Sequence, residues 1–112
     1  MTAANYNLVI DQGSDFDLEL TIKEEGVAKN LSGYSARAQM RPTISSSVVA
    51  GTFTCTILSA EEGKLKLSLP NADSSAIAAG RYFYDLELFT SNDAVVKRLL
   101  KGEVTLNAEV TR

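Results

Sequence analysis

The stretch Arg81–Phe89 reads RYFYDLELF and indicates the fold class of this 112-residue chain. Its even-numbered positions hold tyrosine and leucine, whereas its odd-numbered positions hold charged residues and phenylalanine. Successive side chains of a β-strand point to opposite faces, so this two-residue period predicts a strand with one buried face. The other face is expected to carry Phe83, Asp85, Glu87 and Phe89.

Similar patterns recur on both sides of this stretch, separated by glycine, proline and serine. The expected strands are Tyr6–Ile10, Phe16–Lys23, Tyr34–Arg41, Thr52–Leu58, Lys64–Leu69 and Val95–Leu106. Thr43–Gly51 lacks this period and indicates a surface loop.

One segment predicts a helix. Asn71–Gly80 begins with a capping residue, contains several alanines and ends at glycine, which favours one or two helical turns with Asn71 as the N-cap. Short strands with turn signals at about ten-residue spacing are typical of β-sandwiches. We therefore expect an all-β fold, an immunoglobulin-like antiparallel β-sandwich of seven to eight strands with one short helix.

The last expected strand contains Gly102, which indicates a bulge or bend. Val96 or one of its neighbours is expected to point inward before Gly102, and Val104 and Leu106 after it. A one-residue change of register exchanges the two faces of a strand, so the sequence does not decide which residues before Gly102 point inward.

Length and composition limit the class of protein. A chain of 112 residues with a net charge of −3 fits one soluble domain, 1–112, with its own core. Acidic and basic residues are mixed along the chain, so nucleic-acid binding is not expected. No apolar run reaches the length of a membrane span, and the first fifteen residues show no signal sequence, so we expect synthesis in a cytoplasm and no membrane association.

The residues that usually carry enzymatic chemistry are scarce. The chain has no histidine and one cysteine, so a triad with histidine is excluded and an internal disulfide is impossible. Cys55 alternates with threonines beside Phe53 and Ile57, and is expected to be a small buried hydrophobic residue. The expected function is therefore not enzymatic, and no cofactor or metal is expected.

Two groups of acidic residues are candidates for a functional site. Asp15, Asp17 and Glu19 are typical of a solvated strand face more than of a cation site. Asp85 and Glu87 have the residue types of a glycosidase pair, but pairing of their strand with Tyr34–Arg41 would place arginines beside them.

Those arginines are Arg37 and Arg41, on the outer face of the expected neighbouring strand. They are predicted to form cross-strand ion pairs with Asp85 and Glu87, each worth about 0.2–1 kcal/mol when exposed.

Candidate protein-contact residues remain. Phe83 and Phe89 are expected on the outer face of their strand, either as isolated exposed aromatic residues or as part of a contact patch. The last residues, Val110, Thr111 and Arg112, extend beyond the final strand, where a neighbouring subunit could take them up.

Five segments together resemble a known group of proteins. They are Asp11–Phe16, Leu31–Arg41, Gly63–Leu69, Ala79–Glu87, and Gly102–Leu106 with Val110–Arg112. Nearly the whole chain resembles small virion structural proteins of tailed bacteriophages, especially those of cyanobacterial and marine phages. It is similar, more loosely, to the N-terminal sandwich of phage baseplate upper proteins, which also begins with a strand, a leucine-x-glycine turn and a glycine-x-tyrosine strand.

This resemblance implies a non-catalytic virion component that is present in many copies, in the tail, baseplate or neck. Its partners would be other phage structural proteins, joined through edge strands and termini. The alternatives are a capsid decoration protein and a carbohydrate-binding module.

Overall fold

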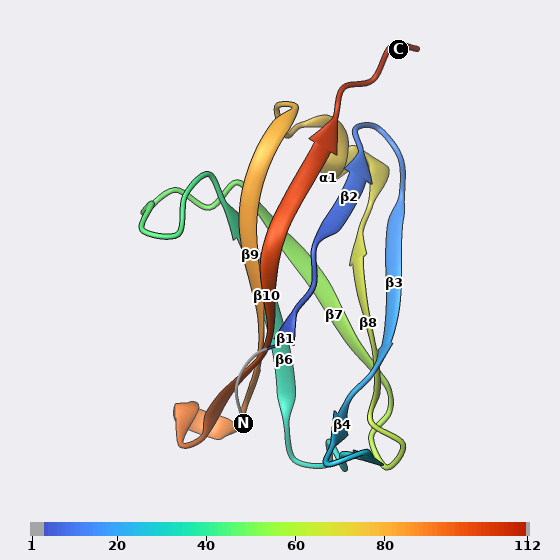
Figure 1. Ribbon diagram of the computed structural model, residues 1–112, viewed down its shortest axis with the longest axis vertical. Helices are drawn as coiled ribbons and strands as arrows, with labels where there is room; N and C mark the ends of the chain where they lie inside the picture. The colour runs from blue at the N-terminus through green and yellow to red at the C-terminus, as the bar shows by residue number, and fades with distance from the viewer. Residues whose placement is uncertain (1–3, 112) are drawn as a thin grey trace.

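The computed structural model describes residues 4–111, whose arrangement is shown in Figure 1. In chain order the elements are β1 (Ala4–Asn5), β2 (Leu8–Asp11), β3 (Phe16–Thr21), β4 (Lys23–Glu24), β5 (Val27–Ala28), β6 (Ser35–Arg41), β7 (Gly51–Ser59), β8 (Lys64–Leu69), α1 (Asn71–Ser75), β9 (Gly80–Phe89), the 3-10 turn η1 (Ser91–Asp93) and β10 (Val96–Asn107). Each strand predicted from the sequence is therefore present, as are the short helix and the loop before β7, although the ends of several elements are shifted.

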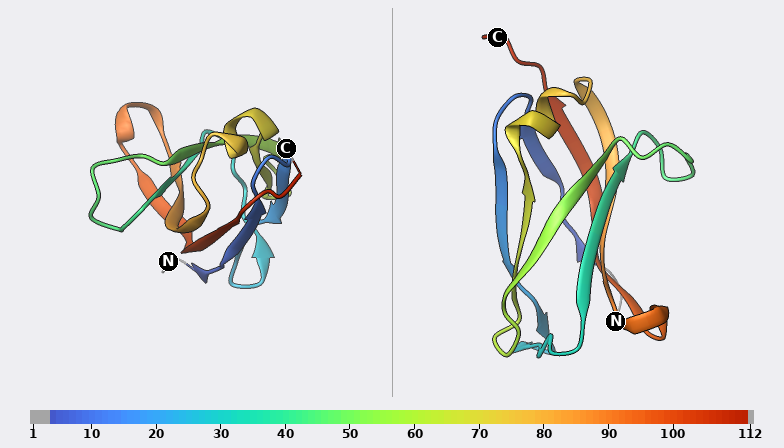
Figure 2. Two further views of the ribbon diagram at one scale, coloured as in Figure 1. Left: turned by 90° about the horizontal axis from the view of Figure 1, so that it is seen from above. Right: turned by 180° about the vertical axis from the view of Figure 1, so that it is seen from behind.

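One curled sheet contains most of these strands. Within the described residues its order is β1-β10-β9-β6-β7-β8-β3, and β2 pairs with β10 beside β1. Strand β7 holds the two halves together, because its first residues pair with β6 and its later residues pair with β8. Figure 2 shows β7 crossing obliquely from one half to the other. Strands β4 and β5 form a separate small hairpin.

This topology confirms the all-β class, corrects one finer prediction and leaves another unconfirmed. The sheet is not entirely antiparallel, because β1 and β2 both run parallel to β10. The immunoglobulin-like sandwich is not confirmed, because the hydrogen-bonded strands follow one another in a single curled sheet.

The inner face of the curled sheet forms an apolar core. Tyr82, Tyr84, Leu86 and Leu88 of β9 are all buried, as the alternation predicts. The other buried apolar residues are Leu8, Ile10, Ile22, Leu31, Ala38, Met40, Phe53, Leu65, Leu67, Leu69, Ile77, Leu99, Leu100, Val104 and Leu106. Cys55 is half-buried at the edge of this core, and burial raises the pKa of its thiol to about 11.

The bulge in β10 lies at Leu99, and the prediction that Gly102 forms it is wrong. The register with β9 shifts between Arg98 and Leu100, so Leu99 and Leu100 are both buried. Val96 is 43% exposed and does not belong to the inward set, whereas Val104 and Leu106 do.

Gly102 has a different role from the one expected. A Cβ atom at this position would collide with the carbonyl group of Tyr6 and approach Asn7 Oδ1 to 2.9 Å. The N-terminal segment therefore packs closely against β10 where β10 has no side chain. The Tyr84 hydroxyl donates a hydrogen bond to the Tyr6 carbonyl at 2.6 Å, and the Glu103 N–H donates to Asn7 Oδ1 at 3.0 Å.

Helix α1 braces the turn between β2 and β3. Its buried Ser74 accepts a hydrogen bond from the Gly13 N–H at 3.1 Å and donates one to the Ser14 carbonyl at 2.8 Å. Asn71 is the first helical residue and not the N-cap, because Pro70 occupies that position. The Asn71 N–H is satisfied by the Asp15 carboxylate at 2.8 Å, so the capping group comes from a distant turn.

Candidate interaction surface

The outer face of β6, β9 and β10 carries most of the residues singled out in the sequence. Phe83, Asp85, Glu87 and Phe89 lie on it, each partly exposed, as the alternation predicts. Because β6 pairs with β9 in antiparallel register, Arg37 lies opposite Glu87 and Arg41 lies opposite Phe83.

Arg37 organises one end of this face. Its Nε donates to Glu87 Oε1 at 2.9 Å, and its Nη1 lies 3.3 Å from Asp93 Oδ1. The same guanidinium stacks over the Phe89 ring, 4.4 Å from its centre. The predicted Arg37–Glu87 ion pair is confirmed. Phe89 is thus partly covered by an arginine of its own chain, in a cation–π contact.

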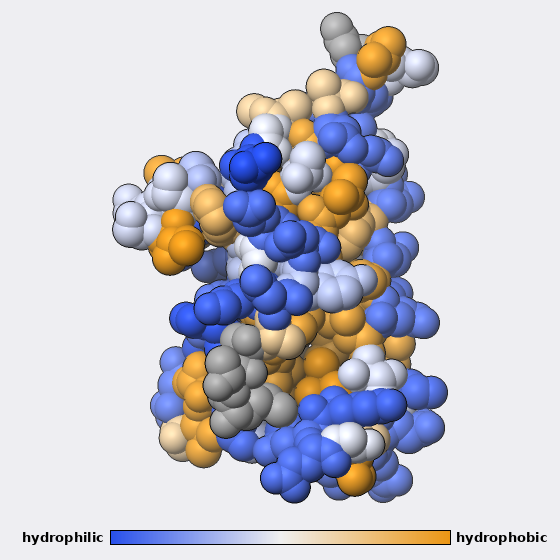
Figure 3. Space-filling model, in the orientation of Figure 1, coloured by the Kyte–Doolittle hydropathy of each residue, from blue (hydrophilic) through white to orange (hydrophobic). Residues whose placement is uncertain are grey.

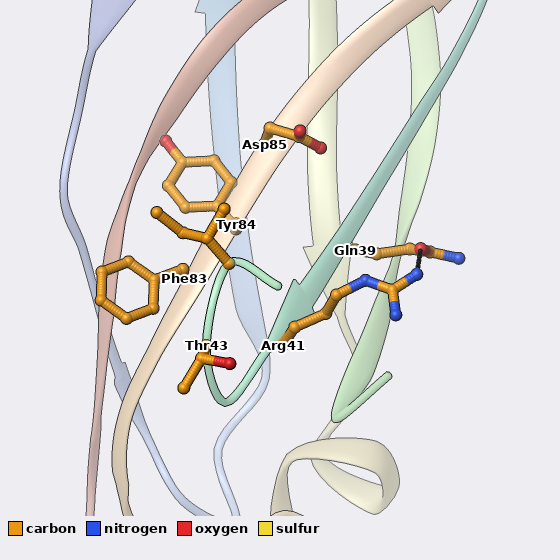
Figure 4. Close-up of a pocket in the computed structure, with 7 residues that line it drawn as sticks. Gln39, Arg41, Thr43, Phe83, Tyr84 and Asp85 are labelled. Atoms are coloured by element: carbon orange, nitrogen blue, oxygen red, sulfur yellow. Dashed lines mark hydrogen bonds between the residues drawn. The ribbon is translucent and has the colours of Figure 1, made fainter. Parts of the chain in front are cut away.

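Arg41 has other partners than the predicted carboxylates. Its guanidinium donates to Gln39 Oε1 at 3.1 Å (Figure 4) and to the Ser46 carbonyl at 3.0 Å. The second of these bonds ties the loop at residues 43–50 to the end of β6. Asp85 instead pairs with Arg98 of β10, where Oδ2 and Nε are 3.2 Å apart.

The surroundings of Asp85 on this face change its pKa. Partial burial, together with the neighbouring charge of Glu87, raises the pKa of Asp85 despite the opposing influence of Arg98, Arg41 and Arg37. The removal of Asp85 from water therefore has a larger effect on its pKa than the ion pair with Arg98 has. Asp85 and Glu87 each have an arginine partner, so their carboxylates are engaged in electrostatic contacts on this face.

A groove on the same face lies beside Phe83. Its volume is about 680 Å³, and it lies between the loop at residues 43–50, β9, and the N-terminal segment against β10. Ile44 and Phe83 supply its apolar lining, while Arg98, Lys101 and Glu103 contribute charge. A smaller hollow of about 110 Å³ adjoins it beside Arg41 and Thr43 (Figure 4). A groove with an apolar part and charged walls suits a protein segment.

Ile44 is the functional candidate that the sequence reasoning missed. It is 82% exposed although it is a large apolar residue, and it lines the groove with Phe83. The sequence feature that could have indicated Ile44 is the presence of an isoleucine in a loop that is rich in serine.

The C-terminal candidates lie away from this groove. Figure 1 shows the chain leaving the sheet after β10 and projecting beyond α1. Val110 is 89% exposed and Thr111 is also exposed, whereas Arg112 lies outside the described residues. The structure does not bring these residues together with Phe83 or Phe89 into one site.

The acidic row beside β3 is divided between two roles. Asp15 precedes the strand and binds the N-terminus of α1, whereas Asp17 and Glu19 point to solvent. Within residues 4–111, no three histidine, cysteine, aspartate or glutamate side chains are arranged to hold a metal ion. The same part of the chain has no helix that is long and apolar enough to cross a bilayer.

Comparison with known proteins gives a structural match only. No protein-family model matches the sequence, and no curated protein sequence does. Among solved structures, the chain is similar to the N-terminal domain of phage TP901-1 ORF48, with a TM-score of 0.58 and 14% sequence identity. The match covers 96% of this chain and 99% of that domain. At this identity the likeness establishes a shared fold.

Proposed function

We propose that this chain is a structural component of a tailed-phage virion that joins tail, baseplate or neck parts. The observation that carries the proposal is the fold shared with the N-terminal domain of phage TP901-1 ORF48 along nearly the whole chain. The sequence resemblance to phage virion proteins supports the same role. Asp85 and Glu87 are both ion-paired with arginines, which agrees with a role in binding other proteins. The proposal gives these two carboxylates no catalytic role.

The proposed contacts are of two kinds. The groove offers Phe83 and Ile44 as apolar anchors, with the Arg37–Phe89 stack on the same face. The C-terminal segment offers Val110, Thr111 and Arg112 to a neighbouring protein. Because a particle presents many copies, contacts that are weak singly are sufficient to hold each copy in place.

The test is the location of the chain in particles of the phage that encodes it. Particles purified by density-gradient centrifugation are analysed by mass spectrometry, and an antibody against the folded chain is used for gold labelling in electron microscopy. We expect several copies per particle and label on the tail, baseplate or neck. Absence from purified particles would overturn the proposal. Label spread over the head would instead identify a capsid decoration protein.

A further inference from the structure

Strand β3 leaves the sheet with an open edge. It pairs with β8 on one side, and no described residue pairs with its other side. Strand β2 is joined to β3 by a short turn, yet the two strands are not hydrogen-bonded to each other. In Figure 3 a hollow with apolar walls separates the side of β1 and β10 from the side of β3. The curled sheet therefore has a seam at β3.

The backbone groups that point into this seam follow from the register. The Ile22 N–H donates to the Gly63 carbonyl at 2.7 Å, on the side where β8 lies. Backbone groups alternate in direction along a strand, so those of Leu18 and Leu20 also point towards β8. The N–H and C=O groups of Asp17, Glu19 and Thr21 point the other way, where they can pair with an added strand.

The side chains of β3 define what such a strand must look like. Leu18 and Leu20 face inward and are only half-buried, although they pack against the core. Asp17 and Glu19 face outward, and neither forms an ion pair within residues 4–111. A strand beside β3 would thus meet apolar surface on one face and negative charge on the other.

We propose that β3 accepts an extended segment of a partner protein in which apolar residues alternate with lysine or arginine. The inference rests on the proposed function, and it names the edge and the chemistry of one partner contact. Apolar residues would cover Leu18 and Leu20, and the basic residues would lie beside Asp17 and Glu19. A second copy of β3 does not fit, because antiparallel pairing of two such edges brings like charges together.

The probe is a short capped peptide in which valine alternates with lysine, compared with the same peptide carrying glutamate for lysine. Amide hydrogen exchange of the whole chain is followed by nuclear magnetic resonance. In the free protein, the amides of Asp17, Glu19 and Thr21 are expected to exchange faster than those of Leu18 and Leu20. The lysine peptide is expected to slow the exchange of the Asp17, Glu19 and Thr21 amides. The glutamate peptide is expected to slow their exchange several-fold less.

Two single-charge variants separate pairing at β3 from general attraction to an acidic protein. Asp17→Lys is expected to weaken binding of the lysine peptide several-fold, because Asp17 lies opposite Ser68 and adjoins the open edge. Glu61→Lys changes the net charge equally in the β7–β8 turn, and is expected to leave binding unchanged.

Three results would overturn the inference. The first is a lysine peptide that protects none of the three amides, and the second is equal weakening by both variants. The third is protection that rises with protein concentration alone, which would identify a second copy as the occupant. Each of these can occur while the chain is still found in phage particles, so a failure here is distinct from a failure of the proposed function.

Discussion

Tyr84 joins the core to the N-terminal segment through one hydroxyl group. Its ring is buried and its hydroxyl donates to the Tyr6 carbonyl at 2.6 Å. Burial is the main cause that raises the pKa of Tyr84 to about 12, with a smaller contribution from Tyr6. The folded protein therefore holds this proton at pH values where an exposed tyrosine loses it.

The first prediction concerns alkaline pH. Below about pH 10 the hydroxyl is protonated in both states, so its contribution to stability is fully present. Between about pH 10 and pH 12 the unfolded chain loses the proton while the folded chain retains it, so the free energy of unfolding falls by roughly 2–3 kcal/mol. Urea unfolding measured across this range, with the wild-type protein and Tyr84→Phe compared, checks it.

Cys55 must be controlled in that experiment. The pKa of its thiol is raised to about 11, so its own contribution to stability is lost over an overlapping range that begins near pH 9. Both proteins are therefore measured in a Cys55→Ala background. Equal loss of stability with pH in the two proteins would contradict the role assigned to Tyr84.

At the scale of elements, α1 is stabilised mainly by what it contacts, because a helix of five residues is too short to be stable alone. Ser74 is fully buried and satisfies both a backbone donor and a backbone acceptor of the β2–β3 turn. Gln12 of the same turn donates from Nε2 to the Ile77 carbonyl at 2.8 Å. The helix and the turn therefore form one hydrogen-bonded unit.

The second prediction follows from this unit. Ser74→Ala leaves the Gly13 N–H and the Ser14 carbonyl without their side-chain partner, and is expected to lower the free energy of unfolding by about 1–3 kcal/mol. Ser75→Ala is the matched control, because Ser75 is exposed and bonds only within the helix, to the Ala72 carbonyl. It is expected to change stability by less than about 0.5 kcal/mol. Similar losses for the two variants in denaturant unfolding would contradict the bracing role.

The strands β6, β8 and β9 were predictable because alternation is a local property of the sequence. The position of the bulge in β10 was not, because Leu99 and Leu100 are both apolar and only pairing with β9 selects which residue is extra. The parallel pairing of β1 and β2 with β10 joins the two ends of the chain, and no local pattern encodes it. The shared use of β7 by β6 and β8 is likewise a property of the assembled sheet.

In the candidate site, too, some features follow from the local sequence pattern and others depend on contacts between distant segments. The outward position of Phe83 follows from alternation alone. That Ile44 lies beside it depends on the bond from Arg41 to the Ser46 carbonyl, which fixes a loop without any periodic pattern. The partner of Asp85 was missed for a related reason, because the prediction considered only β6 and the structure places β10 on the other side of β9.

At the scale of the whole molecule, several of the most exposed apolar side chains lie on projecting segments. The loop at residues 43–50 stands away from the sheet in Figures 1 and 2, and carries Ile44 and Val48 at 82% and 60% exposure. The small hairpin of β4 and β5 carries Val27 at 69% exposure, at another end of the molecule. Surface apolar residues of this kind add little to folding, so they allow contacts to be tested without unfolding the protein.

The last prediction rests on the proposed function and compares two of these residues in phage particles. Ile44→Ser and Val27→Ser each remove a large apolar side chain from the surface, and both are expected to keep the free energy of unfolding within about 0.5 kcal/mol of the wild-type value. Ile44 lines the groove with Phe83, so its loss is expected to reduce the number of copies retained per particle, measured by quantitative mass spectrometry. Val27 lies outside the groove, so Val27→Ser is expected to be retained fully. Equal retention of the two variants would show that the groove is not the contact, and would move the assignment to the C-terminal segment or to the edge of β3.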